Sequence, residues 1–243
     1  MLPRFYIDAA FHAADRVVLP PGAARHAQVL RLQPDDAIVL FNGRGGEWSA
    51  RVLRMARSEV EVRVGEHHAV VRELPQPVTL AVGMPANERM DALIEKATEL
   101  GVAAIQPLLC ERSVLRLAGE RALKKVEHWR GVAVAASEQS GRTCVPRVEP
   151  VRGLAEWLRG LAGGDAAHRL VLSLRDATPF APRASGAAAL CLSGPEGGLT
   201  EAEEAAARAA GFTPVSLGPR VLRADTAPLA VLAALALCRG DAE

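Results

Sequence analysis

Two glycine-rich loops in the C-terminal third of the chain carry the residues best suited to chemistry. They read SGPEGGL at Ser193–Leu199 and SLGPRVLRADTA at Ser216–Ala227, and each follows a short apolar run and precedes a predicted helix. Glycine adopts backbone angles that other residues avoid, so a ligand can approach the main-chain N–H and C=O groups closely. Taken singly, either loop could be an ordinary strand-to-helix turn. Together they predict a pocket built from backbone.

Several familiar chemistries are excluded because their motifs are absent. The sequence has no G-x-x-x-x-G-K-[ST] phosphate loop, no G-x-G-x-x-G fingerprint after the first strands, no G-x-S-x-G elbow and no H-E-x-x-H. The four cysteines form no C-x-x-C pair, which argues against a zinc site or a disulfide scaffold and fits a reducing compartment. His67 and His68 are expected to be exposed or structural. We therefore expect no metal.

The N-terminal part of the chain, residues 1–72, is predicted to be a small antiparallel β-barrel. Val60, Val62 and Val64 alternate with charges in Ser58–Val64, the pattern of a half-buried strand. Asp36–Phe41 and Glu47–Met55 flank the sequence NGRGG and predict a hairpin. One helix is expected at Gly22–Leu32. Short strands with few helix signals are typical of such barrels.

The remaining part, residues 73–243, begins with a predicted linker at Glu73–Pro77 and then alternates strands with helices. The expected strands are Val78–Gly83, Val102–Leu109, Arg169–Leu174, Ala187–Leu192 and Thr213–Leu217. The expected helices are Asn87–Leu100, Gly119–Ser137, Leu154–Leu161, Thr200–Ala210 and Thr226–Cys238. This alternation predicts an α/β fold with a parallel sheet covered on both faces, and ligands bind such sheets beyond the carboxyl ends of the strands.

Three helix starts have recognisable capping signals. We expect Asn87 to be an N-cap, Thr200 and Glu203 to form a capping box, and Asp225 to cap the last helix.

Composition narrows the class of protein further. The chain has 243 residues, 49% of them hydrophobic, and a formal net charge of +1. It can build a full core in one or two domains, and a nucleic-acid partner would have to bind local basic patches. The N-terminal residues show no signal-peptide pattern, and the longest apolar run, Pro228–Cys238, is too short to span a bilayer. We expect a soluble, cytoplasmic protein without a membrane partner.

Six segments together give the chain a family resemblance. They are Arg4-Phe5, His26 with Val29-Leu30-Arg31, EKATELGV at Glu95–Val102, EQSGR at Glu138–Arg142, GPEGGL at Gly194–Leu199 and LGPRVLRADTA at Leu217–Ala227. On these motifs the chain resembles the RsmE family of small-subunit ribosomal RNA methyltransferases, in the SPOUT (trefoil-knotted) superfamily, over essentially its whole length. One departure is Asp225, where the family usually has glutamate.

The resemblance implies a PUA-like RNA-binding barrel at 1–72 and a SPOUT methyltransferase domain at 73–243, whose C-terminal segment forms a trefoil knot. It implies S-adenosylmethionine as cofactor, S-adenosylhomocysteine as product and a homodimer. The implied reaction is methylation of uracil N3 of a single uridine in 16S rRNA of the small subunit, giving 3-methyluridine near the decoding site.

The resemblance also suggests site residues. The expected cofactor-binding positions are Leu174, Gly194, Glu196, Gly197, Leu217, Gly218, Leu222, Thr226 and Ala227. Arg223 is expected to neutralise a phosphate or the uracil anion, unless it only pairs with Glu196 or Asp225. Glu138 and Arg142 are the other catalytic candidates, with Arg142 on RNA and Glu138 as organiser or base, and their i,i+4 spacing also allows a simple ion pair.

In the barrel, the expected RNA-positioning residues are Arg4, Arg25, His26, Arg31 and Arg44, which could equally be ordinary solvated side chains. Two other functions stay open on the sequence. One is a nonenzymatic RNA-binding or ribosome-assembly factor, against which the intact loops argue. The other is methylation of a ribose 2′-oxygen or of guanine N1.

Overall fold

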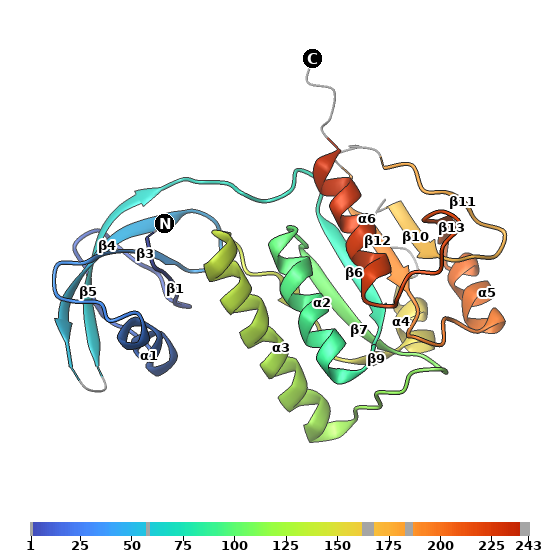
Figure 1. Cartoon of the computed structure of the whole chain (residues 1–243), viewed down its shortest axis with the longest axis horizontal. Coiled ribbons are helices and arrows are strands. Elements are labelled where there is room, and N and C mark those ends of the chain that lie inside the picture. Colours follow the sequence, from blue (N-terminus) through green and yellow to red (C-terminus); the bar gives the residue numbers. More distant parts are fainter. Residues whose placement is uncertain (1, 57–58, 162–167, 183–186, 239–243) are drawn as a thin grey trace, which may run out of the picture. The chain divides into compact units, whose positions relative to one another are not determined.

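The computed structural model describes residues 2–56, 59–161, 168–182 and 187–238, and the chain divides into two compact units (Figure 1). The first comprises Met1–Glu73 and Ser137–Val145, and the second comprises Leu74–Ala136 and Pro146–Glu243. The first boundary lies one residue after the predicted one. The segment Ser137–Val145, which we had assigned to the second domain, belongs to the first unit.

The first unit is built on a five-stranded sheet. Its strands, in spatial order, are β1 (Arg4–Tyr6), β3 (Ala37–Phe41), β4 (Glu47–Met55), β5 (Val60–His68) and β2 (Arg16–Val18). The predicted hairpin is present as β3 and β4, and the pairs β4–β5 and β5–β2 are also antiparallel. β1, however, pairs with β3 in parallel, so the sheet is mixed. Helix α1 (Pro21–Val29) contributes the buried Ala24 and Ala27 to the core of this unit.

Five charged residues of the first unit form a cluster, which we call the charge cluster: Arg4, Glu47, Arg72, Glu73 and Arg142. The Nη1 atoms of Arg4 and Arg72 lie 2.5 and 2.8 Å from Oε2 of Glu47. Arg142 pairs with Glu73. Arg4 is only 5% exposed and Arg142 only 3%, so each needs these partners to offset its loss of hydration.

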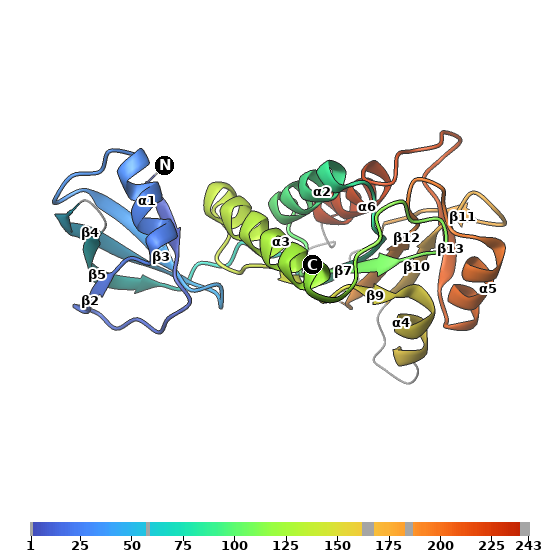
Figure 2. The ribbon, with the colours of Figure 1, turned by 90° about the horizontal axis from the view of Figure 1, so that it is seen from below.

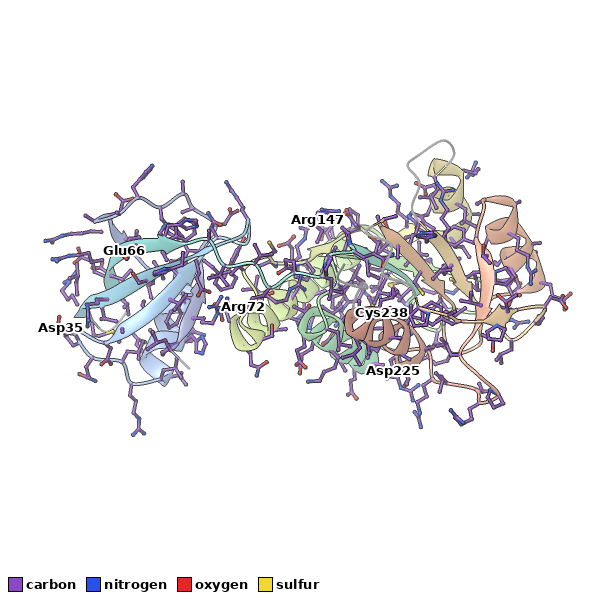
Figure 3. The ribbon with its side chains drawn as sticks, turned by 90° about the horizontal axis from the view of Figure 1, so that it is seen from above. Asp35, Glu66, Arg72, Arg147, Asp225 and Cys238 are labelled. Atoms are coloured by element: carbon purple, nitrogen blue, oxygen red, sulfur yellow. The ribbon has the colours of Figure 1, made fainter. Side chains whose placement is uncertain are left out.

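The charge cluster also fixes the segment Ser137–Val145 to the rest of its unit. The second guanidinium nitrogen of Arg4 donates to the carbonyl of Arg142 at 3.0 Å. Arg72, labelled in Figure 3, donates to the carbonyl of Gly141 at 2.9 Å. Two arginines that hold Glu47 therefore also hold the backbone of a segment distant in sequence.

The cluster makes the stability of the protein depend on pH. The hydrogen bond from Arg72, against the opposing effect of burial and with a further hydrogen bond from Arg4, lowers the pKa of Glu47 from 4.5 to about 2. Because this pKa is lowered on folding, the stabilisation is complete above pH 4.5 and is lost as the pH falls through about 2. A pKa shift of that size corresponds to about 3 kcal/mol of stabilisation of the folded state.

We therefore expect Glu47→Gln to lower the free energy of unfolding by about 3 kcal/mol at pH 7 and to bring the variant and wild-type curves together towards pH 2. Urea denaturation at a series of pH values measures this. Glu66→Gln, at an exposed carboxylate of the neighbouring strand β5, serves as control and should leave the pH dependence unchanged. Parallel curves for Glu47→Gln and wild type between pH 5 and pH 2 would contradict the assignment.

The second unit contains an entirely parallel sheet. Its main path runs β11 (Thr178–Pro179), β13 (Thr213–Ser216), β10 (His168–Leu172), β12 (Ala189–Ser193), β6 (Val78–Gly83), β7 (Ala104–Leu109) and β8 (Arg147–Val148), and β9 (Arg152–Gly153) also pairs with β7. The three central strands β12, β6 and β7 are nearly all buried, as expected for a parallel sheet covered on both faces. The predicted α/β fold class is confirmed.

Helices cover both faces of this sheet (Figure 2). On one side α2 (Asn87–Glu99) contacts α6 (Thr226–Leu237), and α6 contacts β6 and β12. On the other side α4 (Leu154–Gly160) contacts α5 (Glu201–Ala209), and both contribute to one apolar core. The long helix α3 (Gly119–Ser140) lies beside α2, where the indole N–H of Trp129 donates to Asp91 at 2.9 Å. In the part of the chain that the structure describes, no helix is long and apolar enough to cross a membrane.

Of the three predicted caps, one is confirmed and two are wrong. Thr200 and Glu203 form the predicted capping box at α5. Helix α2 begins with Ala86 as its N-cap, so Asn87 is already the first helical residue. Asp225 occupies the N-cap position of α6 in a helical conformation, and its side chain makes no capping bond.

The end of the chain returns to the middle of the sheet. In the sheet, β13 lies between β10 and β11, near one edge. Helix α6, which follows β13 in the sequence, packs against β12 and β6, nearer the centre of the sheet. Residues 217–225 therefore have to pass the connection between β10 and β12. The predicted trefoil knot depends on that connection, part of which, residues 183–186, lies outside the described residues.

Candidate functional site

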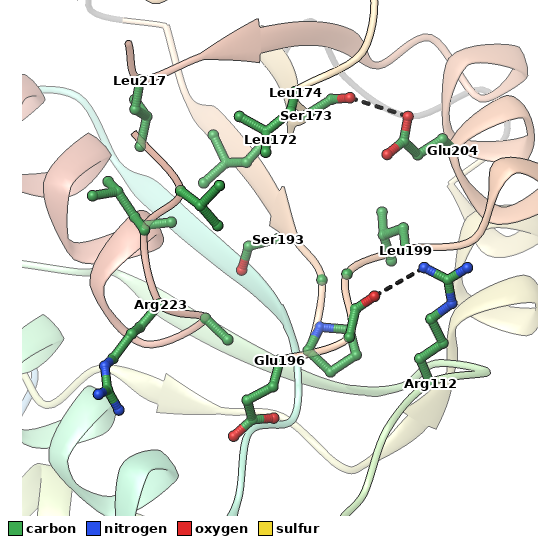
Figure 4. Close-up of a pocket in the computed structure, with 18 of the residues that line it drawn as sticks. Arg112, Leu172, Ser173, Leu174, Ser193, Glu196, Leu199, Glu204, Leu217 and Arg223 are labelled. Atoms are coloured by element: carbon green, nitrogen blue, oxygen red, sulfur yellow. Dashed lines mark hydrogen bonds between the residues drawn. The ribbon is translucent and has the colours of Figure 1, made fainter. Parts of the chain in front are cut away.

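A pocket of about 560 Å³ opens at the carboxyl ends of β10, β12 and β13 in the second unit (Figure 4). Both glycine-rich loops line it, as predicted. A volume of this size is typical of small-molecule sites. Its apolar wall consists of Leu172, Leu174, Leu199, Val215, Leu217 and Leu222.

Close backbone packing gives the pocket its shape. A Cβ atom on Gly194 would lie 2.7 Å from the backbone nitrogen of Leu199 and 2.8 Å from the carbonyl carbon of Gly198. A Cβ atom on Gly83, at the end of β6, would lie 2.5 Å from the ring of Pro195. Contacts this short with backbone or a ring require a shift of the loop. The first glycine-rich loop therefore folds back on itself and rests on the end of a neighbouring strand only because both positions are glycine.

Side chains from distant parts of the second unit hold the first loop in place. Oε1 of Glu196 accepts a hydrogen bond from the backbone N–H of Ala86 at 3.0 Å and lies 3.5 Å from Nη1 of Arg89. Arg112 donates to the carbonyl of Gly197 at 2.9 Å. The start of α2 and the chain after β7 are thus both tied to this loop, which pre-organises the pocket.

One buried polar group in the pocket has no protein partner. The hydroxyl of Ser193 lines the cavity, and the residue is only 2% exposed, yet this oxygen has no hydrogen bond within the described structure. Figure 4 shows it directed into the space between the loops. By contrast, the nearby Ser173 donates to Glu204 at 3.0 Å. Buried polar groups are rarely left unsatisfied, so the Ser193 hydroxyl indicates where a polar atom of a ligand would bind.

Arginines outnumber carboxylates around the pocket. Its charged lining consists of Arg89, Arg112, Arg175, Arg220, Arg223, Glu196 and Glu204. Arg220 and Arg223 are exposed and, among the described residues, pair with no carboxylate. Arg223 therefore does not make the alternative ion pair with Glu196 or Asp225. This positive excess at the mouth of the pocket suits an anionic partner.

Most of the predicted cofactor positions lie together in the pocket. Leu174, Gly194, Glu196, Gly197, Leu217, Leu222 and Ala227 all line it. Gly218 and Thr226 do not. Gly218 instead has φ +100°, which permits the turn after β13, and Thr226 begins α6. Arg112 and Glu204 were not predicted, because Arg112 lies outside the glycine-rich loops and Glu204 lies within a predicted helix. Ser193 begins the first loop but was not singled out as a binding residue.

Glu138 and Arg142 lie in the first unit and are not among the residues that line this pocket. Glu138 accepts a hydrogen bond from the backbone N–H of Tyr6 at 2.9 Å and lies 3.6 Å from Nδ1 of His26. Burial raises the pKa of Glu138 despite these contacts. Arg142 pairs with Glu73 in the charge cluster. Both side chains therefore have structural partners other than each other.

The five arginines and histidines expected to position RNA have different environments. Arg4 is buried in the charge cluster, and His26 packs edge-on against Phe5 at 5.4 Å between ring centres. Arg44 pairs with Asp8 at 2.9 Å on the surface. Arg25 and Arg31 are exposed. His26 is also exposed, so of the five only Arg4 lacks the accessibility that contact with RNA requires.

The cysteines and histidines add no second chemistry. Burial raises the pKa of both Cys110 and Cys191 to about 12, so neither is a thiolate at neutral pH. His67 and His68 are exposed, as expected, and His67 packs on Trp48. The described residues contain no group of three His, Cys, Asp or Glu side chains that could hold a metal ion.

Two family models match the chain. Residues 72–236 match the RNA methyltransferase domain, and residues 19–65 match the RNA methyltransferase PUA domain. Among curated proteins, the ribosomal RNA small subunit methyltransferase E of Bacillus subtilis is 36% identical over 225 residues, which cover 88% of each chain. The protein of the same name from Synechocystis is 36% identical over 210 residues, covering 85% of this chain and 67% of the relative.

Solved structures agree with these matches. A crystal structure of a ribosomal RNA small subunit methyltransferase E from Neisseria gonorrhoeae, bound to S-adenosyl methionine, has a TM-score of 0.90 and 38% sequence identity over 96% of each chain. A methyltransferase from Legionella pneumophila, in complex with the bound cofactor SAM, has the same TM-score and 31% identity over 97% of each chain.

Proposed function

Because the chain belongs to the ribosomal RNA small subunit methyltransferase E family, we propose that it methylates N3 of a single uridine in 16S rRNA, near the decoding site. At the level of the family it is an rRNA methyltransferase that uses S-adenosylmethionine. That the methyl group goes to uracil N3, that a single nucleotide is modified, and that it lies near the decoding site are parts of our proposal. The observation that carries it is the backbone pocket with an arginine-rich mouth at the ends of β10, β12 and β13.

The residues of the pocket fit this cofactor. When bound, S-adenosylmethionine supplies a methyl group on a sulfonium, and the protein has to align it with the acceptor. The apolar wall suits an adenine ring, and the unpartnered hydroxyl of Ser193 offers a hydrogen bond. The carboxylates of Glu196 and Glu204 suit the positive charge of this cofactor. No metal is needed for such a transfer.

The chemistry at the acceptor requires removal of a proton. Uracil N3 carries a proton and becomes a good nucleophile only when that proton leaves. A guanidinium next to the base would stabilise the resulting anion, and Arg223 is exposed at the mouth of the pocket with no carboxylate partner among the described residues. We assign Arg223 this role.

We propose that Glu138 and Arg142 either contact the RNA bound to the other subunit of a homodimer or position other residues of their own unit. Neither lines the pocket of its own chain. In a homodimer whose active sites lie near the subunit interface, a second copy could bring its own segment Ser137–Val145 to the RNA. Light scattering of the purified protein measures the dimer, and a monomer at micromolar concentration would contradict this part of the proposal.

Mass spectrometry of nucleosides tests the reaction itself. 16S rRNA and small subunits from cells that lack the protein would be incubated with the purified protein and S-adenosylmethionine. We expect 3-methyluridine at one position. A 2′-O-methylated nucleotide or 1-methylguanosine would keep the enzyme class and overturn the target. Neither methylation nor cofactor binding in calorimetry would favour an assembly factor. The proposal also places the protein in the cytoplasm, with the ribosomal subunits.

The Ser193 hydroxyl provides a separate test of cofactor binding. We expect Ser193→Ala to weaken the affinity for S-adenosylmethionine roughly 3- to 10-fold, the effect of losing one hydrogen bond. The free protein should keep or slightly gain stability, because the change removes a buried hydroxyl that has no partner.

Ser113→Ala is the matched control for this variant. Its buried hydroxyl accepts from the backbone N–H of Cys110 at 3.0 Å, so this variant should lose stability and keep its cofactor affinity. Calorimetry and thermal unfolding separate the two effects. An unchanged affinity in Ser193→Ala would remove this residue from the cofactor site.

A further inference from the structure

We propose that Arg16, Arg51 and Arg63 form a phosphate-binding row on the outer face of the barrel sheet, which holds the sugar-phosphate backbone of the rRNA substrate. This inference rests on the proposed function, because it identifies a surface by which the same enzyme holds its RNA. None of the three was among the residues that the sequence singled out.

The strand register brings these three arginines side by side. Arg63 of β5 is directly opposite Arg16 of β2 on one side and Arg51 of β4 on the other. Directly opposed residues of neighbouring strands point to the same face and lie about 5 Å apart. The neighbours of Arg63 along its strand, Val62 and Val64, are buried, so the arginine row lies on the solvent side of the sheet. All three arginines are exposed.

Like charges placed directly opposite each other destabilise a sheet, so such a row needs an explanation. Among the described residues Arg63, at its centre, pairs with no carboxylate. Arg16 reaches Glu61 only at 3.8 Å, and Arg51 donates to the backbone carbonyl of Asp35 at 2.8 Å. In the row as a whole, three positive charges face a single distant carboxylate.

Several other arginines of the same unit have close acidic partners. Arg4 and Arg72 pair with Glu47, Arg44 pairs with Asp8, and Arg54 pairs with Glu59. Arg25 and Arg31 are exposed and, like Arg63, pair with no carboxylate among the described residues. Arg63 differs from them because two further arginines lie directly opposite it, and this concentration of uncompensated charge points to an anionic partner from outside the chain.

A groove next to the row offers room for that partner. A cavity of about 460 Å³ is lined by Arg51 and Arg63 together with Ser49, Gly65 and His68. Gly65 has no side chain to fill it, and a Cβ atom there would lie 2.4 Å from the hydroxyl of Ser49. Glu47 also lines the groove, but Arg4 and Arg72 neutralise its charge. The groove therefore combines the positive charge of two arginines and a few polar groups with an apolar floor of strand residues.

The chemistry of the row suits phosphodiesters better than other anions. Guanidinium groups bind phosphate oxygens through paired N–H donors, and a line of them spaced about 5 Å apart can bind successive phosphates of one strand. Contacts of this kind carry no base identity. They give affinity and register, and they weaken with salt.

The test measures the salt dependence of RNA binding by the full-length protein. Binding of unmodified 16S rRNA would be followed by fluorescence anisotropy over a range of KCl concentrations, for the wild type and for the triple variant Arg16→Gln, Arg51→Gln, Arg63→Gln. Each lost phosphate contact lowers the slope of log affinity against log salt by about 0.7 to 0.9, so we expect a decrease of about 2 to 3. The single variant Arg63→Gln should lower the slope by about 0.7 to 0.9.

Arg54→Gln is the matched control. It removes one positive charge from the same strand as Arg51, but Arg54 already has Glu59 as a partner, so its slope should match that of the wild type. Thermal unfolding of the triple variant should be unchanged or occur at a higher temperature, since like-charge repulsion is relieved. A triple variant with wild-type slope, or one whose slope falls no further than that of Arg54→Gln, would contradict the proposed binding of phosphates by this row.

Cofactor calorimetry and nucleoside analysis distinguish this failure from failure of the proposed function. If the wild type methylates 16S rRNA and the triple variant keeps the wild-type slope, the proposed function is supported and the phosphate-binding row is contradicted. If the wild type binds rRNA through the row but transfers no methyl group, the phosphate-binding row is supported and the proposed function is contradicted. A wild type that binds no rRNA would overturn both.

Discussion

We expect methyl transfer to fall roughly 100-fold to 1,000-fold when Arg223 is replaced by alanine, the range measured when one group that stabilises a developing negative charge is removed. Arg223 is exposed at the mouth of the pocket, and among the described residues no carboxylate neutralises it. Its loss should leave the fold and cofactor binding nearly intact, because its charge serves the acceptor base. Single-turnover methylation of 16S rRNA, together with calorimetry for S-adenosylmethionine, measures the two effects separately.

Two further variants sharpen this prediction. Arg223→Lys keeps the positive charge and should recover part of the lost rate. Arg159→Ala removes an exposed arginine of α4 whose one hydrogen bond among the described residues goes to a carbonyl of its own helix, and it should behave as wild type. An Arg223→Ala protein that keeps its rate within twofold, with saturating RNA, would exclude the residue from the chemistry.

The second large effect is expected at Gly194. A methyl group there would meet the backbone of Leu199 and Gly198 at 2.7 to 2.8 Å, so Gly194→Ala must displace the first glycine-rich loop. Because this loop forms one wall of the pocket, we expect the affinity for S-adenosylmethionine to fall by at least about 10-fold, or about 1.4 kcal/mol. Calorimetry on the purified variant measures it.

Gly131→Ala provides the comparison. Gly131 lies within α3, a Cβ atom there meets nothing within 4 Å, and the change should stabilise the helix slightly. Equal cofactor affinities for Gly194→Ala and Gly131→Ala would show that the loop can move without harming the site.

The helix caps show how far local sequence rules reach. The capping box of Thr200 and Glu203 was predictable because both partners lie within one turn. The start of α2 was not, because the backbone N–H of its N-cap Ala86 is satisfied by Glu196, which is 110 residues away in the sequence. No rule based on neighbouring residues can identify such a partner.

The candidate site likewise contains some residues that local sequence could predict and others that it could not. The glycine-rich loops predicted most of the pocket because they follow apolar strands of a parallel sheet, whose ends must meet at one edge. Arg112 could not be recognised, since its role depends on a hydrogen bond to Gly197, which is 85 residues away in the sequence. Ser193 begins the first glycine-rich loop, but only the structure shows that its buried hydroxyl has no partner among the described residues. Arg142 follows the end of a helix in a family-like motif. Only the fold reveals that Glu73, in a predicted linker, pairs with it.

The charge cluster has a consequence for the order in which the chain is made. The first unit is discontinuous: residues up to Glu73 leave the ribosome long before Ser137–Val145, which completes the unit. At roughly 5 to 20 residues per second, the intervening stretch takes several seconds to synthesise. During that interval Glu73 lacks Arg142, and Arg4 and Arg72 lack the carbonyls of Arg142 and Gly141. The N-terminal unit therefore cannot reach its final state during synthesis until most of the second unit's first half has also emerged.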